Sequence, residues 1–215
     1  MTGIAPTHLK LFVVRPSLKA LGLWSEAAEN LLVGTALAES RAAYLRQVTS
    51  AGYGPALGLW QMDPFTHNDC WLNFLNGSKQ ATLRRVVSLM ISMNLPGVDQ
   101  LATNLRYACA MARIKFYRAP AALPAASDAA ALSQYHKRFY NTATGAADTT
   151  ANATFFQEAI NACLICVFNG DTAMNLAGIS GGGSSNWPTG RVGSRNTGAL
   201  TVPSNISSPT MPTRG

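Results

Sequence analysis

The sequence predicts an all-α fold, with about seven helices in residues 1–177 and an irregular tail in residues 178–215. Apolar residues recur at three- and four-residue spacing in almost every segment before the tail, and no alternation of apolar and polar residues lasts long enough for a strand. Capping residues and Gly or Pro breakers separate these segments. The length of 215 residues suits one domain with a hydrophobic core.

The first helices are placed by their start signals. Pro16 fits the first position of a helix. Ser25 fits the N-cap of the next helix, where two glutamates in the first turn favour the helix dipole. Apolar positions at helical spacing continue from there to about Arg41. Glu39 is therefore expected in the last turns of this helix.

Residues 49–65 contain too many breakers for a helix, namely Gly52, Gly54, Pro55, Gly58 and Pro64. We predict an irregular loop with tight turns here, and we expect this loop to face Glu39.

The remaining helices are each predicted between a capping residue and a breaker. They run from Thr66 to Asn76, from Lys79 to Pro96, from Asp99 to Pro120, from Ser127 or Asp128 to Tyr140 and from Thr154 to Asn169. In the helix that follows Asp99, we interpret Arg106, Arg113 and Lys115 as solvated neighbours of the buried stripe.

From Gly178 onward the chain is rich in Gly, Ser, Thr and Pro, and it carries Arg191, Arg195 and Arg214 without any acidic residue. This composition cannot bury enough apolar surface to order itself, so we expect the tail to be disordered in isolation. The net charge of +7 would attract anionic surfaces without selecting one. No basic helix with interleaved aromatic residues indicates a specific nucleic-acid partner.

Composition disfavours several classes of protein. No run of eighteen apolar residues is present, and the N-terminus matches neither a transmembrane helix nor a signal peptide, so no membrane span is expected. We interpret Cys70, Cys109, Cys163 and Cys166 as buried, reduced core thiols, because the C-x-x-C of the last two lacks a second pair of ligands. The histidines are scattered, so neither a metal site nor a cofactor is expected.

The dipeptide Glu39-Ser40, followed by the turn Gly58-Leu59-Trp60-Gln61-Met62-Asp63-Pro64, indicates a site that cleaves a glycosidic bond. This reaction needs a carboxylic acid that is still protonated near neutral pH and can donate to the leaving oxygen. Glu39 shares the apolar stripe of Leu32 and Ala36, so we expect burial to raise its pKa.

A resemblance to a known family is carried by four pieces of sequence in this order: Glu39-Ser40, Gly58-Leu59-Trp60-Gln61-Met62 with Pro64, Asp99 with Asn104, and Tyr140-Asn141. The chain resembles the lysozyme-like lytic transglycosylases of the soluble lytic transglycosylase type, and among them the virion-associated enzymes of tailed phages. It departs from the family in two places. The family usually has Met where Trp60 stands, and Ala-Tyr-Asn-Ala-Gly where this chain reads Phe139-Tyr140-Asn141-Thr142-Ala143.

The resemblance implies that residues 1–177 form a lysozyme-like catalytic domain that cleaves the bond between N-acetylmuramic acid and N-acetylglucosamine in bacterial peptidoglycan. It implies that Glu39 protonates the glycosidic oxygen and then, as a carboxylate, takes a proton from the muramyl C6 hydroxyl. A 1,6-anhydro sugar then forms without a second carboxylate. The implied substrate-binding roles are that Ser40 positions or polarises the sugar, Gln61 hydrogen-bonds it, Tyr140 orients Glu39 or the sugar, Asn141 lines the cleft and Trp60 offers a stacking face.

Each of these assignments has a structural alternative. The alternatives are a rim salt bridge of Glu39 with Arg41 or Arg46, core packing of Trp60 or Tyr140, and hydrogen bonds from Gln61 to the backbone of its own turn. Asp63 is a candidate second carboxylate, because an inverting muramidase needs one to activate water. We favour the simpler interpretation that Asp63 begins a helix in front of Pro64.

For the whole protein, we expect an enzyme carried in the phage particle that opens the host cell wall at the periplasm during genome delivery. The tail is expected to bind other virion proteins. The competing hypotheses are a virion tail or connector protein with an inactive lysozyme-like domain, and a module that binds wall glycan without cutting it.

Overall fold

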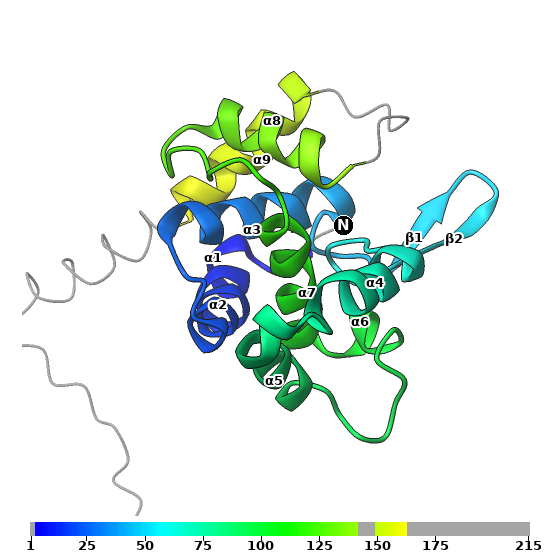
Figure 1. Ribbon diagram of the computed structural model, residues 1–215. Coiled ribbons are helices and arrows are strands. Elements are labelled where there is room, and N and C mark those ends of the chain that lie inside the picture. The colour runs from blue at the N-terminus through cyan, green and yellow to red at the C-terminus, as the bar shows by residue number, and fades with distance from the viewer. Residues whose placement is uncertain (1–2, 142–148, 163–215) are drawn as a thin grey trace, which may run out of the picture. The chain divides into compact units, whose positions relative to one another are not determined.

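The computed structural model describes residues 3–141 and 149–162, which are mostly helical and include a small two-stranded sheet (Figure 1). The helices are α1 (Pro6–His8), the π-helical η1 (Leu9–Val14), α2 (Arg15–Leu21), α3 (Glu26–Ser40), α4 (Pro64–Cys70), the π-helical η2 (Trp71–Leu75), the 3₁₀-helical η3 (Ser78–Gln80), α5 (Ala81–Leu89), α6 (Gln100–Thr103), α7 (Leu105–Tyr117), α8 (Ala129–Phe139) and α9 (Thr149–Asn161). The strands are β1 (Arg46–Thr49) and β2 (Gly52–Leu57). The predicted tail in residues 178–215 and the cysteines Cys163 and Cys166 lie outside the described residues.

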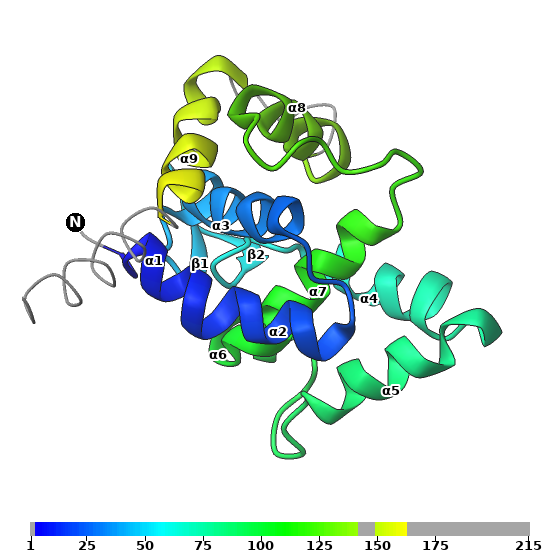
Figure 2. The same ribbon diagram turned by 90° about the vertical axis from the view of Figure 1, so that its left-hand side faces the viewer.

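Helices α3 and α7 form the centre of the described fold. Both are buried over successive residues and therefore on every side, which is the pattern of a helix enclosed by its neighbours. Helices α8 and α9 pack on each other and on α3, while α2, α4, α5 and α6 contact α7 (Figures 1 and 2). Within these described ranges, no helix has the length and apolar character needed to cross a membrane.

Helix α3 begins and ends as the sequence predicts. The Ser25 hydroxyl oxygen accepts a hydrogen bond from the Ala28 backbone N–H at 3.1 Å and so caps the helix. Arg41 terminates it in the left-handed conformation, with φ of 57°. Glu39 therefore lies in the last turn, as predicted. At the middle of the helix, Gly34 allows close approach of α9, because a Cβ atom there would collide with the ring of Phe156.

Pro16 lies in the first turn of α2, close to its predicted place at the first helical position, but α2 does not begin as a separate helix. Helical structure begins at Pro6 and continues through η1 into α2, so Pro16 lies inside the run. In a regular α-helix, an internal proline has no N–H to donate and its ring collides with an earlier carbonyl. The π turn directly before it, in which Arg15 N donates to Lys10 O, allows the run to continue past Pro16.

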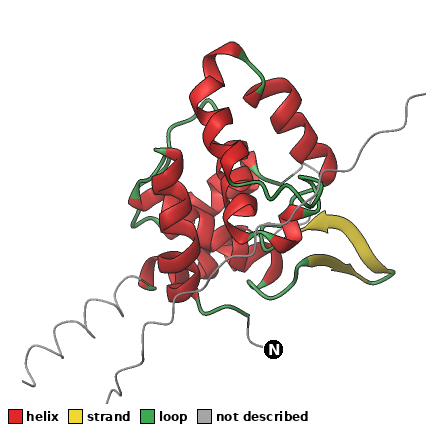
Figure 3. Ribbon diagram, turned by 90° about the horizontal axis from the view of Figure 1, so that it is seen from below, coloured by secondary structure: helices red, strands yellow, loops and turns green. Residues whose placement is uncertain are grey.

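Residues 46–57 form a β-hairpin where an irregular loop was predicted, so the all-α expectation is wrong in this segment (Figure 3). The strands are antiparallel, with Thr49 opposite Gly52 next to the turn and an irregularity between Arg46 and Val48. Most of their side chains are exposed. Strands that bury so little carry no alternation of apolar and polar residues, which is why the pattern gave no strand signal.

The other helix boundaries are partly as predicted. Helix α8 is capped by Asp128, whose carboxylate accepts from Ala131 N at 2.9 Å, as expected. The helix predicted from Asp99 is instead divided at Asn104, which caps α7 through its side-chain oxygen. Helix α9 begins at Thr149, before the predicted cap at Thr154.

The short helix α4 begins earlier than predicted. It starts at Pro64 and is capped by Asp63, whose Oδ1 accepts from Phe65 N at 2.7 Å, whereas Thr66 was predicted as the cap. Proline at the first helical position loses nothing, because that N–H has no partner within the helix. Cys70, at the end of α4, is a buried free thiol as predicted, and so is Cys109 in α7.

Candidate active site

A groove of about 430 Å³ lies where several helix ends meet the hairpin. The C-terminal ends of α3, α7 and α8, the start of α4 and the base of the hairpin all contribute side chains to it. Its lining consists of Glu39, Gln47, Pro55, Ala56, Gln61, Asp63, Phe65, Thr66, Lys115, Tyr140 and Asn141. Glu39, Gln61, Asp63, Tyr140 and Asn141, which the sequence singled out, are thus brought together.

Glu39 is held by a histidine that the sequence analysis did not assign to the site. Its Oε1 lies 2.9 Å from Nε2 of His136 on α8, and the Glu39 side chain is 19% exposed. Neither arginine of the rim salt-bridge alternative is its partner. Arg41 lies over the ring of Phe155, and Arg46 donates to a carbonyl in the hairpin.

His136 is enclosed by aromatic rings and donates from one side only. The side chain is 1% exposed, with the ring of Tyr140 stacked at 5.7 Å and that of Phe156 at 5.6 Å between centroids. Within the described residues its Nδ1 has no hydrogen-bond partner. A buried N–H without an acceptor is costly, so we place the hydrogen on Nε2, from which it donates to Glu39. This hydrogen bond then occupies one carboxyl oxygen of Glu39, and the other oxygen remains available for proton transfer.

Tyr140 is a buried part of the groove wall. Its hydroxyl donates to Trp60 O at 2.9 Å, and its side chain also stacks on Phe116. Burial, followed by the nearby Glu39 carboxylate, raises the pKa of Tyr140 well above its ordinary value, so it stays a neutral donor. The Tyr140 ring therefore packs against the His136 ring that bonds Glu39, and the neighbouring Asn141 lines the groove directly.

Gln61 lies in a tight turn that also needs a glycine. Gln61 has φ of 45° and Gly58 has φ of 74°. A Cβ atom at Gly58 would collide with the backbone oxygen of Leu101, so both the dihedral angle and the close approach require glycine there. The Gln61 amide nitrogen donates to Gly58 O at 2.7 Å and to Tyr44 O at 3.3 Å. Gln61 thus stabilises the backbone of its turn, as the alternative held, while it also lines the groove.

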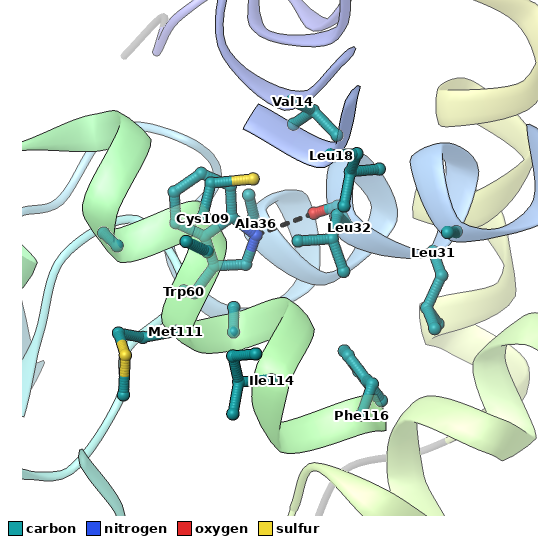
Figure 4. Packing of buried hydrophobic residues seen from close by; sticks show 14 of the residues in the cluster. Val14, Leu18, Leu31, Leu32, Ala36, Trp60, Cys109, Met111, Ile114 and Phe116 are labelled. Carbon is teal, nitrogen blue, oxygen red and sulfur yellow. Dashed lines mark hydrogen bonds between the residues drawn. The ribbon is translucent and has the colours of Figure 1, made fainter. Parts of the chain in front are cut away.

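Two of the predicted substrate contacts are wrong. Trp60 offers no stacking face, because it is 1% exposed and its indole N–H donates to Leu32 O at 2.9 Å in the core (Figure 4). Ser40 is 3% exposed, and its hydroxyl lies 2.7 Å from Leu59 O and 3.1 Å from Ala36 O. Both residues fasten the Gln61 turn to α3. The sequence places Ser40 next to Glu39 on the helix, but it does not show which side of that helix the turn covers.

Asp63 has a structural role in addition to its place in the groove. It caps α4, as the favoured interpretation held, and it also lines the same pocket as Glu39. Its Oδ1 accepts the hydrogen bond from Phe65 N.

Lys115 is the groove residue that the sequence analysis misassigned. It was interpreted as a solvated neighbour of the α7 stripe, but it is half-buried in the groove wall and donates to Tyr140 O at the end of α8. Burial lowers the pKa of Lys115, and the carboxylates of Glu39 and Asp63 oppose that effect. Arg113, interpreted in the same way, is also buried, at 6% exposure. Long side chains with apolar stems pack against a core in ways that spacing alone does not reveal.

No group of three His, Cys, Asp or Glu side chains in the described ranges is arranged to hold a metal ion.

Comparisons of the chain with protein-family models, with curated protein sequences and with solved structures found no match. Functional assignment therefore depends on the chemistry of the groove residues.

Proposed function

We propose that this protein is a peptidoglycan lytic transglycosylase with a lysozyme-like catalytic domain, in which Glu39 is the only acid and base. The observation that carries this proposal is a carboxyl group at a helix end, oriented by a buried histidine and open to a groove. Segments that are far apart in the sequence supply Gln61, Tyr140 and Asn141 to the same groove. The segment from Asp99 to Asn104 packs behind the turn, where Leu101 approaches Gly58.

The first step is proton transfer from Glu39 to the glycosidic oxygen between N-acetylmuramic acid and N-acetylglucosamine. Oε1 accepts the N–H of His136, so the transferred proton is carried by Oε2. As the C–O bond breaks, negative charge develops on the Glu39 carboxyl group. The His136 N–H is already aimed at this group and stabilises the charge without reorganisation.

In the second step, the Glu39 carboxylate takes the proton of the muramyl C6 hydroxyl, and that oxygen bonds to the anomeric carbon. Glu39 is reprotonated, and the products are a 1,6-anhydromuramyl end and a free N-acetylglucosamine end. One carboxyl group serves both steps, so Asp63 remains the cap of α4. If Asp63 instead activated water, the product would be a reducing muramyl end.

We further propose that the protein is carried in a phage particle and acts on the host wall at the periplasm, with the basic tail of residues 178–215 bound to other virion proteins. The resemblance to virion-associated transglycosylases supports this location. The composition of the tail, which is basic and poor in large apolar residues, suits a segment that is ordered by its partners.

The test is digestion of purified sacculi by the full chain, followed by mass spectrometry of the released muropeptides. We expect 1,6-anhydro ends from the wild type and from Glu26→Gln, which removes an exposed carboxylate from the other end of the same helix. We expect none from Glu39→Gln. Reducing muramyl ends would contradict the transglycosylase reaction and favour hydrolysis with Asp63. If folded wild type released no products, the proposed activity would be wrong, and a structural or glycan-binding role would replace it.

A further inference from the structure

Lys115 lies where two pockets meet. The first is the Glu39 groove, and the second, also about 430 Å³, is called here the Arg118 pocket and is lined by Thr66, Asp69, Lys115, Arg118, Ala119, Pro120, Phe139, Tyr140 and Asn141. Four of these residues, Thr66, Lys115, Tyr140 and Asn141, line both pockets. The two pockets are therefore parts of one longer groove, and Lys115 stands in the wall that they share.

The Lys115 ammonium group is incompletely compensated. Within the part of the chain that the structure describes, it donates one hydrogen bond, to Tyr140 O, and it lies 4.1 Å from the centroid of the Tyr140 ring. An ammonium group has three N–H donors, so two remain. Lys115 belongs to none of the ion pairs formed among residues 3–141 and 149–162.

The carboxylates near Lys115 are already engaged by other groups. Glu39 is bonded to His136, and Asp63 accepts from the backbone of α4. Asp69 accepts from Arg118 at 2.5 Å and from Asn73 at 2.6 Å. Arg118 is thus directly ion-paired with Asp69, whereas no carboxylate of the described residues lies within ion-pair distance of Lys115, which has only the longer-range attraction of Glu39 and Asp63.

The two halves of the groove consequently differ in charge. The Glu39 groove is lined by two carboxyl groups and one cation, whereas the Arg118 pocket is lined by two cations and one carboxylate. A partly buried cation favours an anion that can accept its free N–H donors. An anionic group would therefore bind on the Arg118 side of Lys115, away from Asp63.

We propose that Lys115 binds a carboxylate carried by the sugar chain, in the Arg118 pocket next to the bond that Glu39 attacks. This inference rests on the proposed function, because it assigns to Lys115 the recognition of the acidic sugar in the same groove. Thr66 and Asn141, which also line both pockets, supply polar groups for the same sugar. In muramic acid that carries no stem peptide, the carboxylate is that of the lactyl group, and its recognition would fix which sugar lies on which side of Glu39.

The test measures binding by titration calorimetry with the full chain in a Glu39→Gln background, so that no glycan is cleaved. The two probes are a neutral β-1,4-linked N-acetylglucosamine oligomer and a glycan of matched length that contains muramic acid. We expect Lys115→Gln to weaken binding of the acidic glycan about 10- to 100-fold, because a charge-assisted hydrogen bond is lost. Binding of the neutral oligomer should change by less than about threefold. The matched control, Arg106→Gln, removes an exposed cation from the same helix and should change neither.

A second comparison changes the glycan instead of the protein, and is made on the parent chain and on Lys115→Gln. Methyl esterification of the lactyl carboxylate should weaken binding by the same factor when Lys115 is present, and should have no effect on Lys115→Gln. An equal loss of affinity for both glycans in Lys115→Gln, or binding of the ester as tight as that of the acid, would overturn the inference. Lys115 would then have only the structural role of its hydrogen bond to Tyr140 O.

The outcomes for Lys115 and for the proposed function are separable. Discrimination between the two glycans without cleavage by wild type would refute the transglycosylase activity alone. Cleavage by wild type without discrimination would refute the role of Lys115 alone. Failure of the protein to bind either glycan would contradict both.

Discussion

Replacement of His136 by Phe tests whether its N–H orients Glu39. The ring is 1% exposed, stacks on Tyr140 and contacts the tilted ring of Phe156, so Phe retains the packing and removes both ring nitrogens. The change loses a hydrogen bond to an ionisable group, which contributes about 1.5–3 kcal/mol. It also removes a buried Nδ1 that has no partner in the described residues, and such an atom costs about 1–3 kcal/mol. We therefore expect the free energy of unfolding to change by no more than about 1–2 kcal/mol.

The effect of His136→Phe on turnover should be larger than its effect on stability. The hydrogen bond that is lost stabilises the developing charge on Glu39, so kcat should fall about 10- to 100-fold with little change in KM. His136→Gln is the matched variant, because its amide N–H can replace Nε2–H as a donor to Glu39. The assay compares turnover of soluble glycan strands with urea unfolding of the same samples. If folded His136→Phe kept the wild-type kcat, or if His136→Gln lost as much as His136→Phe, orientation by the N–H would be the wrong explanation.

Three further predictions concern stability and binding. Trp60→Phe should lower the free energy of unfolding by about 1–3 kcal/mol without changing glycan affinity, because Trp60 fills the core; a selective loss of glycan binding at unchanged stability would contradict this. Gly58→Ala should destabilise by at least about 1–3 kcal/mol, measured by urea unfolding, because of its positive φ and the approach of Leu101; wild-type stability would contradict the turn geometry. Burial lowers the pKa of His67 below its unfolded value of 6.5, and its Nε2 lies 2.7 Å from the Tyr107 hydroxyl. The unfolded chain then binds the proton more readily, so the stability that neutral His67 contributes is present above pH 6.5 and is lost as the pH falls through the lowered pKa. His67→Gln should remove this part of the pH dependence of the free energy of unfolding. An unchanged pH profile in that variant would refute the prediction.

Those elements whose signals are local could be predicted from the sequence. Ser25 caps α3 and Asp128 caps α8 through their own side chains, so the residue type at the capping position was enough to place each helix start. The position of Glu39 in the last turn of α3 followed from the same helix. The β-hairpin was missed because its strands bury few side chains, and α9 begins at Thr149 although Thr154 gave the stronger capping pattern.

The parts of the site that depend on packing between distant elements could not be predicted. Nothing near His136 in the sequence indicates that α8 places it 2.9 Å from Glu39. Spacing on α7 likewise gives no information on whether Lys115 extends into solvent or into the groove. The burial of Trp60 depends on how the Gln61 turn is fastened to α3, which is a tertiary contact. A buried ring with a single acidic partner is a signal that only the three-dimensional arrangement provides.

The most direct test of Glu39 as the acid and base is the single-turnover rate of Glu39→Gln on soluble muramic-acid-containing glycan strands, with binding measured on the same sample. The substitution keeps the size of the side chain and an oxygen that can accept the His136 N–H, so affinity and stability should stay close to those of wild type. The rate should fall by at least about 10²- to 10⁴-fold, because the transferable proton is lost. Glu26→Gln should cleave at the wild-type rate. If Glu39→Gln cleaved the glycan at a rate close to that of wild type, another group would have to supply the proton, and the assignment of Glu39 would be wrong.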